Sequence, residues 1–118
     1  MRHQKKNLKM NMQRDRRQSV LRSMATSLIL FEKIKTTECR AKQVRGIVEN
    51  LITKAKTKTT HTAIRAIGAV VFDKNASKKL LEVLKERYKE RSGGYTRIVK
   101  MGFRVGDSAK VVSLQLVE

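Results

Sequence analysis

Residues 92–107 read SGGYTRIVKMGFRVGD, and this stretch decides the fold that the sequence predicts. The pair Gly93-Gly94 interrupts a helical pattern, and the β-branched and aromatic residues behind it favour an extended strand. Gly106-Asp107 supplies turn residues, and a second apolar run follows over 110–117. Two extended runs joined by a turn predict a β-hairpin.

Side chains of the first strand alternate between two faces, which we expect to serve different purposes. One face takes Ile98, Lys100, Gly102 and Arg104, and the other takes Arg97, Val99, Met101, Phe103 and Val105. We expect Met101 and Phe103 to be buried against a core. Lys100 and Arg104, about 13 Å apart along the strand, would then meet separate phosphates of a polyanion.

A large positive charge dominates the composition. The chain has 118 residues, with 28 Lys and Arg against 10 Asp and Glu, and its net charge is +18. Such a surface repels itself unless a large anion neutralises it, so we expect nucleic acid as the partner and an anionic membrane only as a distant second. The length fits one domain, and 40 % apolar residues suffice for a modest core.

Cysteine usage and hydropathy indicate a soluble, unsecreted protein. Cys39 is the only cysteine, so it cannot form an internal disulfide, and the sequence lacks the clusters that a four-ligand zinc site needs. The apolar run 24–31 is too short to span a bilayer, and Glu32 and Lys33 follow it without a signal-peptide cleavage pattern. We therefore expect a free thiol in a reducing, cytoplasmic compartment.

Residues 1–14, MRHQKKNLKMNMQR, form a basic segment without an acid or a sustained apolar period. Burial cannot offset the entropy of ordering such a segment, so we expect a basic, extended N-terminal arm. Three interpretations remain open: an arm that orders on RNA, a solvated tail, and a mitochondrial transit peptide. The transit peptide is disfavoured because the positive charge continues through the rest of the chain.

Behind the arm, apolar spacing predicts a single domain over 15–118. Helical periods occur over 15–31, 38–56 and 62–72 and from Asn75 to the glycine pair, with Asp15 and Asn75 as candidate caps. β-Branched residues alternate with lysines over 33–37, which predicts a short strand. The buried stripe expected of the second helix consists of Ala41, Val44, Val48, Leu51, Ile52 and Ala55. This order predicts a two-layer α+β fold, with helices on one face of a small sheet.

A series of short motifs extends along nearly the whole chain. The most specific is Gly93-Gly94-Tyr95-Thr96-Arg97-Ile98, with Lys100, Gly102, Arg104, Gly106 and Asp107 behind it. The others are Met1-Arg2-His3, Met24-Ala25 with Ser27-Leu28, Glu32 with Ile34, Thr36-Thr37, Ala41-Lys42, and Glu49 with Leu51-Ile52-Thr53 and Ala55-Lys56. On these residues the chain resembles the bacterial ribosomal protein family numbered seventeen in the large subunit.

The resemblance implies a basic N-terminal arm, a small α/β body and binding to large-subunit ribosomal RNA. It also implies a place in the ribosome, cytoplasmic or organellar, beside other large-subunit proteins. Family members often carry histidine where Arg16 and Phe31 stand and proline where Glu86 stands, whereas this chain has no proline. The segment 57–79 matches the family least.

Candidate RNA-binding residues lie in the arm, on the first helix and on the strands. Arginine offers a planar fork and lysine a mobile point charge, and both suit an irregular phosphate surface. The strand cations are the better candidates because strands hold side chains at fixed separations. The predicted set is Arg2, His3, Lys5, Lys6, Lys9, Arg14, Arg16, Arg17, Arg22, Lys33, Lys35, Tyr95, Arg97, Lys100 and Arg104.

Aromatic residues are too few for a stacking platform that reads single strands. Phe31, Phe72 and Tyr88 have helical positions that predict burial in the core. Tyr95 is left with two roles, packing beside the glycine turn or contact with a base or ribose. Gly93-Gly94 follows a helix instead of opening one, so turn formation is favoured over a phosphate cradle.

Neither catalysis nor a cofactor is predicted. His3 and His61 could suggest a ribonuclease, but no pattern in the sequence holds them at proton-transfer geometry. Met10 and Met12 lack neighbouring Cys or His and are poor metal ligands. The competing hypothesis is a free-standing nucleoid protein that coats DNA through charge alone, and composition leaves it open.

Overall fold

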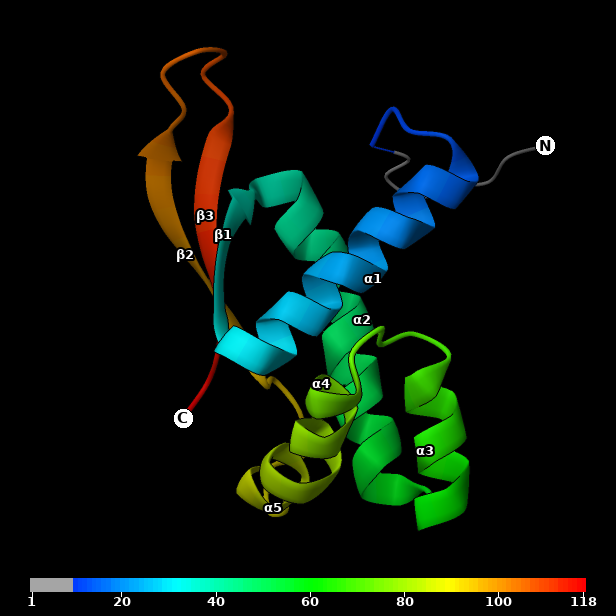
Figure 1. Ribbon diagram of the computed structural model, residues 1–118. Helices are drawn as coiled ribbons and strands as arrows, with labels where there is room; N and C mark the ends of the chain where they lie inside the picture. Colours follow the sequence, from blue (N-terminus) through cyan, green and yellow to red (C-terminus); the bar gives the residue numbers. More distant parts are fainter. Residues whose placement is uncertain (1–9) are drawn as a thin grey trace, which may run out of the picture.

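The computed structural model describes residues 10–118, in which helices lie on one face of a three-stranded antiparallel sheet (Figure 1). The predicted two-layer α+β fold is therefore confirmed. The elements are α1 (Arg14–Phe31), β1 (Lys33–Thr37), α2 (Glu38–Thr57), α3 (Thr60–Gly68), α4 (Lys74–Lys79), a π-helical turn η1 (Leu80–Leu84), α5 (Lys85–Arg87), β2 (Thr96–Phe103) and β3 (Lys110–Leu116).

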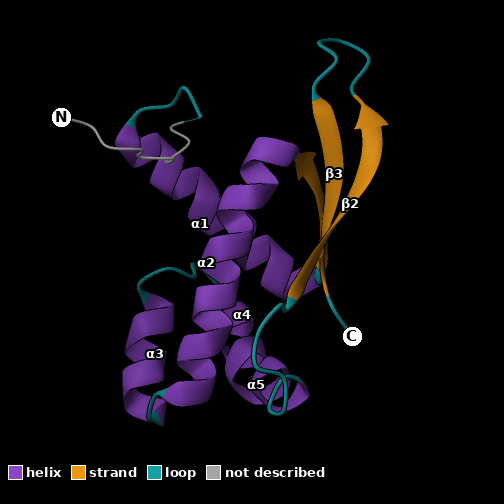
Figure 2. Cartoon of the chain, turned by 180° about the vertical axis from the view of Figure 1, so that it is seen from behind, coloured by secondary structure: helices purple, strands orange, loops and turns teal. Residues whose placement is uncertain are grey.

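The sheet has the order β1-β3-β2, so the predicted hairpin of β2 and β3 places β3 in the centre. Ile34, Leu114 and Ile98 lie opposite one another across the three strands and point toward the helices. Val112 and Leu116 of β3 are buried on the same face. Seen from behind, α1 and α2 both lie on this side of the sheet and leave its other face open (Figure 2).

Helices α1 and α2 together supply nearly half of the buried apolar residues in the described part of the chain. The six residues predicted as the buried stripe of α2 are all buried, and α1 contributes Leu21, Ala25, Leu28 and Ile29. Complete burial of each large aliphatic side chain contributes about 1.5 to 3 kcal/mol, which explains why these two helices pair so closely. In the described part of the chain, no helix combines the length and apolar character needed to cross a membrane.

Helix boundaries differ from the predictions where capping decides them. Gln13 occupies the N-cap position of α1, and the predicted cap Asp15 lies inside the first turn. Asp73, not Asn75, caps α4, and its side chain accepts a hydrogen bond from the Asn75 amide at 2.8 Å. Helix α3 ends at Gly68, before the predicted 72, and Ile64 remains half exposed. In each case the apolar period predicted that a helix is present but not the residues at which it begins and ends.

The helix predicted from Asn75 to the glycine pair is divided into α4, η1 and α5. Leu80, Leu84 and Tyr88 are buried as expected. The other two aromatic predictions are wrong, because Phe31 is 72 % and Phe72 is 54 % exposed. Phe72 instead lies under the Arg22 guanidinium, whose central carbon is 4.1 Å from the ring centroid.

Glu32 connects the end of α1 to the sheet and to the α4–α5 region. Its backbone is left-handed, with φ 62°, its amide donates to the Leu28 carbonyl, and its carbonyl accepts from the Leu116 amide at 2.9 Å. Its carboxylate accepts two hydrogen bonds from Arg87, at 2.8 and 3.0 Å, and lies 2.8 Å from the Lys79 ammonium. These contacts, the Arg87 hydrogen bonds above all, lower the pKa of Glu32 to about 2.

Candidate nucleic-acid interface

The uncovered side of the sheet carries basic side chains. We call this surface the open sheet face and define it by Lys33, Lys35, Arg97, Val99, Ser113 and Gln115, which lie opposite one another in the strand register. Lys33 and Arg97 flank Gln115, while Lys35 and Val99 flank Ser113. Their neighbours in β3, Val112 and Leu114, point into the core, so the alternation directs these six residues away from the helices.

Strand geometry fixes the separation of the three cations. The Cα atoms of Lys33 and Lys35, two residues apart on one strand, are separated by about 6.6 Å. The Cα atom of Arg97 lies two strands away from that of Lys33, at about 9.6 Å. Between these cations, Gln115 donates a hydrogen bond from Nε2 to the Ser113 hydroxyl at 3.1 Å, so the two polar side chains of β3 are bonded to each other. The six residues include three cations and no carboxylate, a composition that favours an anion.

A hollow at one end of this face brings two predicted residues together. Lys35 and Arg104 line it together with Thr36, Thr37 and Val111, and its volume is about 280 Å³. The two threonines were not among the predicted site residues, although alternation on β1 places Thr37 on the face of Lys33 and Lys35. Ammonium, guanidinium and hydroxyl groups are the donors that phosphate oxygens accept from.

Arg104 is already paired with Asp107, which does not line this hollow. Its Nε donates to the Asp107 carboxylate at 2.9 Å, and a second guanidinium nitrogen contacts the other carboxylate oxygen. The arginine lowers the pKa of Asp107 to about 2 and thereby keeps the acid charged. Part of the positive charge of Arg104 is therefore neutralised, so Lys35 is the stronger anion-binding group of the pair.

The predicted grouping of strand residues into two faces holds up to Lys100 and is wrong behind it, because of a β-bulge. Lys100 pairs with Val112 but Gly102 pairs with Val111, so Met101 is an extra residue and the alternation inverts behind it. Gly102 has φ 113°, a conformation that favours glycine. Phe103 now lies opposite Lys110, on the side of Lys100, and Arg104 no longer shares a face with Lys100.

Burial also contradicts the expected packing role of the apolar strand residues. Met101 is 53 % and Phe103 71 % exposed, whereas Ile98, from the other predicted face, packs against the core. A glycine inside a strand pattern is a known signal of a bulge, so Gly102 was the residue that could have revealed the inversion.

The predicted cations of α1 occupy different environments. Arg14 and Arg16 are exposed and Arg17 is half-buried. Arg22 has a structural contact, since its Nε donates to the Val70 carbonyl at 2.9 Å while its guanidinium lies over Phe72. The remaining predicted residues lie outside the part of the chain that the structure describes: Arg2, His3, Lys5, Lys6 and Lys9.

Tyr95 belongs to the core, as the packing alternative predicts. Its side chain is 2 % exposed, and its ring centroid lies 5.0 Å from that of Tyr88. The hydroxyl accepts a hydrogen bond from the Lys56 ammonium at 2.9 Å and donates to the Arg91 carbonyl at 3.2 Å. With its ring covered, Tyr95 has no face on which a base could stack.

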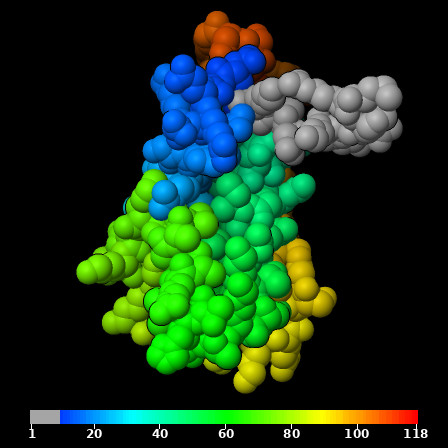
Figure 3. Space-filling view, turned by 90° about the vertical axis from the view of Figure 1, so that its right-hand side faces the viewer, coloured from blue at the N-terminus to red at the C-terminus, as the bar shows by residue number. Residues whose placement is uncertain are grey.

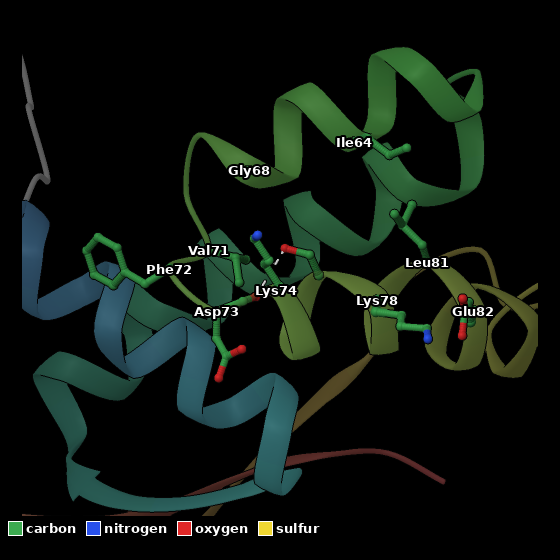
Figure 4. A pocket seen from close by; sticks show the side chains of 10 residues that line it. Ile64, Gly68, Val71, Phe72, Asp73, Lys74, Lys78, Leu81 and Glu82 are labelled. Atoms are coloured by element: carbon green, nitrogen blue, oxygen red, sulfur yellow. Dashed lines mark hydrogen bonds between the residues drawn. The ribbon is translucent and has the colours of Figure 1, made fainter.

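A second concave surface lies on the opposite end of the molecule, between α3 and the α4–η1 segment (Figure 4). The groove has a volume of about 580 Å³, and Ile64, Phe72 and Leu81 give it an apolar lining. Asp73 and Glu82 lie among its lysines, so its charges are mixed. This composition distinguishes the groove from the open sheet face and does not favour phosphate.

Comparison with known proteins gives consistent matches along the chain. A family model described as ribosomal protein L17 matches residues 20–117. The chain is 50 % identical over 109 residues to the large ribosomal subunit protein bL17 of Desulforudis audaxviator, covering 92 % of this chain and 96 % of that protein. It is 45 % identical over 118 residues to the bL17 protein of Rickettsia typhi, covering 100 % of this chain and 85 % of the relative.

Proposed function

Because the chain belongs to the ribosomal protein L17 family, we propose that it is a structural constituent of the large ribosomal subunit that binds and stabilises large-subunit rRNA. Ribosomal proteins of this kind are not an enzyme family, so the proposed role is structural and without catalysis. The observation that carries the proposal is the open sheet face, where Lys33, Lys35 and Arg97 are exposed with no acid among them.

Strands make these cations effective because their positions are fixed before RNA arrives. Arg97 offers a guanidinium fork that can grip two oxygens of one phosphate, and the lysines supply point charges to others. The hollow at Lys35 adds the hydroxyl groups of Thr36 and Thr37. The sheet thereby positions donors for an irregular phosphate surface without reading base edges.

The other cations of the proposed RNA-binding set belong to the start of α1 and to the basic segment 1–14. Arg14, Arg16 and Arg17 begin α1, and residues 1–9 contribute four more Lys and Arg. The net charge of +18 supports a partner that carries many negative charges, and folded rRNA has them along its whole backbone. In the proposed complex the arm and the sheet contact different parts of one RNA.

A free-standing nucleoid protein is the competing proposal, since phosphate binding alone does not distinguish RNA from DNA. The two proposals differ in where the protein is found. We expect it to sediment with large ribosomal subunits in high salt, in the cytoplasm or in an organelle, beside other large-subunit proteins. Sedimentation with the chromosome would favour the nucleoid protein instead.

The binding surface is tested by replacing Lys33, Lys35 and Arg97 together with alanine. Affinity for large-subunit rRNA should fall, and the slope of log affinity against log salt should decrease by about one for each phosphate contact removed. The thermal stability should change little because all three side chains are exposed.

A matched control removes three cations from the other end of the molecule, Arg65, Lys74 and Lys78. Equal losses in the two triple variants would mean that total charge, not the open sheet face, determines binding.

The unmodified protein should lose roughly 10³-fold in affinity between 50 and 200 mM salt if it makes six phosphate contacts, taking duplex DNA as a guide. A flat salt response would contradict an interface dominated by phosphate contacts.

A further inference from the structure

The turn of the β2–β3 hairpin projects beyond the helices as a separate feature. We call residues 101–109 the hairpin tip. Both ribbon views show it extending past the end of β1 (Figures 1 and 2), and the space-filling view places its orange atoms at the end opposite α3 and α4 (Figure 3). Its large side chains are apolar and exposed: Met101 by 53 %, Phe103 by 71 % and Val105 completely.

Hydrogen bonds hold the hairpin tip in one conformation although the core does not cover it. The Arg104 amide donates to the Ala109 carbonyl at 2.8 Å, and the Ser108 amide donates to the Arg104 carbonyl at 2.9 Å. The Asp107 carboxylate accepts from the Ala109 amide at 3.2 Å as well as from Arg104. The entropy of ordering this turn is therefore lost before any partner binds, which favours tight association.

The charge of the hairpin tip differs from that of the rest of the chain. Residues 101–109 contain one cation and one anion, Arg104 and Asp107, and these two are paired with each other. The hairpin tip is thus neutral in a chain of net charge +18. Because Asp107 partly neutralises Arg104, the hairpin tip itself offers little positive charge to a phosphate.

A hollow of about 290 Å³ lies beside Phe103. Val111 and Val112 give it an apolar floor together with Gly102, and Lys100, Lys110 and Glu38 surround it. Glu38 already forms an ion pair with Lys42 at 3.3 Å. Glu38 also interacts electrostatically with Lys100 and Lys110, so one carboxylate faces three lysines at this rim. The rim keeps an excess of positive charge, which favours a partner carboxylate at the edge of an otherwise apolar contact.

We propose that the hairpin tip is a docking surface for a neighbouring protein of the large subunit, one that presents an apolar side chain bordered by an acidic residue. The apolar side chain enters the hollow beside Phe103, and the acid faces Lys100 and Lys110. RNA fits this surface less well, because Arg104, the one cation of the hairpin tip, is paired with Asp107, whose carboxylate repels phosphate. That the partner is a protein of the large subunit rests on the proposed function.

Cross-linking in the assembled particle tests the proposal. Phe103 is replaced by a photoreactive benzoylphenylalanine, the full chain is incorporated in cells, and purified large subunits are irradiated. We expect a cross-link to one subunit protein, mapped to an apolar segment with an adjacent Asp or Glu. A cross-link to rRNA, or none above the level seen with the same residue at position 83 on η1, would overturn the proposal.

A variant measurement separates this inference from the proposed rRNA binding. Met101, Phe103 and Val105 are replaced together with serine, and Val83→Ser, another exposed apolar position, serves as the control. Incorporation in competition with the unmodified protein should fall about tenfold, as for the loss of a central interface residue, while affinity for naked rRNA and its salt slope stay unchanged. Unchanged incorporation, or an equal loss of rRNA affinity, would contradict docking to a protein. If rRNA binding by the unmodified chain failed instead, the cross-linking result would still stand.

Discussion

The two ends of the β2–β3 hairpin have opposite environments. At the root, Tyr95 is 2 % exposed, its carbonyl accepts from the Val117 amide, and Thr96 donates from its hydroxyl to the Glu49 carboxylate at 2.8 Å. At the tip, Phe103 is 71 % exposed. Both ends have strand pairing and similar apolar residues, so what separates them is whether a helix reaches that part of the sheet. Pairing holds the hairpin together, but burial at one end anchors it.

The largest loss in the free energy of unfolding should follow removal of an aromatic side chain that packs against the root of the hairpin. Tyr88 is 1 % exposed, packs against Tyr95, and donates its hydroxyl proton to the Val117 carbonyl. Tyr88→Ala should lower the free energy of unfolding by about 3 to 5 kcal/mol, because it leaves a cavity and an unpaired carbonyl. Denaturant unfolding followed by circular dichroism measures the change. Phe31→Ala is the matched control, and an equal loss in both would show that burial does not distinguish these aromatics.

Glu32 should give the next largest effect and the clearest pH dependence. Glu32→Gln keeps the side-chain shape but removes the charge that Arg87 and Lys79 contact, and we expect a loss of about 1 to 2 kcal/mol at pH 7, since partial exposure screens the ion pairs. The folded pKa of about 2 lies below the ordinary 4.5. The stabilisation is therefore present above pH 4.5 and is lost as the pH falls toward 2.

Thermal unfolding at pH 7 and at pH 3 measures this dependence. The difference between Glu32→Gln and the unmodified protein should be smaller at pH 3. Glu38→Gln provides the control, because the ion pair of Glu38 with Lys42 is exposed at the i,i+4 position, where solvent screens it strongly. A difference for Glu32→Gln that grows as the pH falls would mean that the carboxylate is not held charged by its partners.

The sequence predicts the root of the hairpin well because several signals agree there. The glycine pair and the β-branched run predict the turn and the strand behind it, the apolar period of the preceding helix predicts the burial of Tyr88, and the stripe of α2 supplies the opposing layer. Packing beside the glycine turn was one of two roles predicted for Tyr95. Glu32 was recognised only as part of a motif. Its left-handed backbone and its contacts with Arg87, 55 residues away, are tertiary features that no local pattern contains.

The tip was predicted incorrectly because the alternation rule assumes an unbroken register. The extra residue Met101 moves each later side chain of β2 to the face opposite the predicted one. The rule also gives no information on how far the helices extend over the sheet. The predicted cations Lys33, Lys35 and Arg97 precede this irregularity and therefore share one face. Their binding to rRNA stays a prediction, as does that of the residues in the segment 1–9.

A smaller effect at the root tests how much its hydrogen bonds contribute beyond packing. Tyr95→Phe keeps the buried ring but removes the hydroxyl that Lys56 and the Arg91 carbonyl contact. We expect a loss of about 0.5 to 1.5 kcal/mol in the free energy of unfolding, the usual contribution of such hydrogen bonds. Lys56 also donates directly to the Arg91 carbonyl, which limits the loss. A loss as large as that of Tyr88→Ala would mean that the polar contacts, not the paired rings, anchor the hairpin.

The smallest effect should come from Phe103→Ala, and this prediction decides whether the two ends of the hairpin differ as described. Its ring is 71 % exposed, so truncation removes little buried area and leaves no cavity, and we expect the free energy of unfolding to change by less than about 0.5 kcal/mol. A buried aromatic at this position would instead cost about 3 to 5 kcal/mol. Denaturant unfolding of Phe103→Ala beside Leu114→Ala, a completely buried residue of the same sheet, gives the comparison directly. Equal losses in these two variants would place Phe103 in the core of the free protein. The hairpin tip would then have no exposed apolar surface with which to dock.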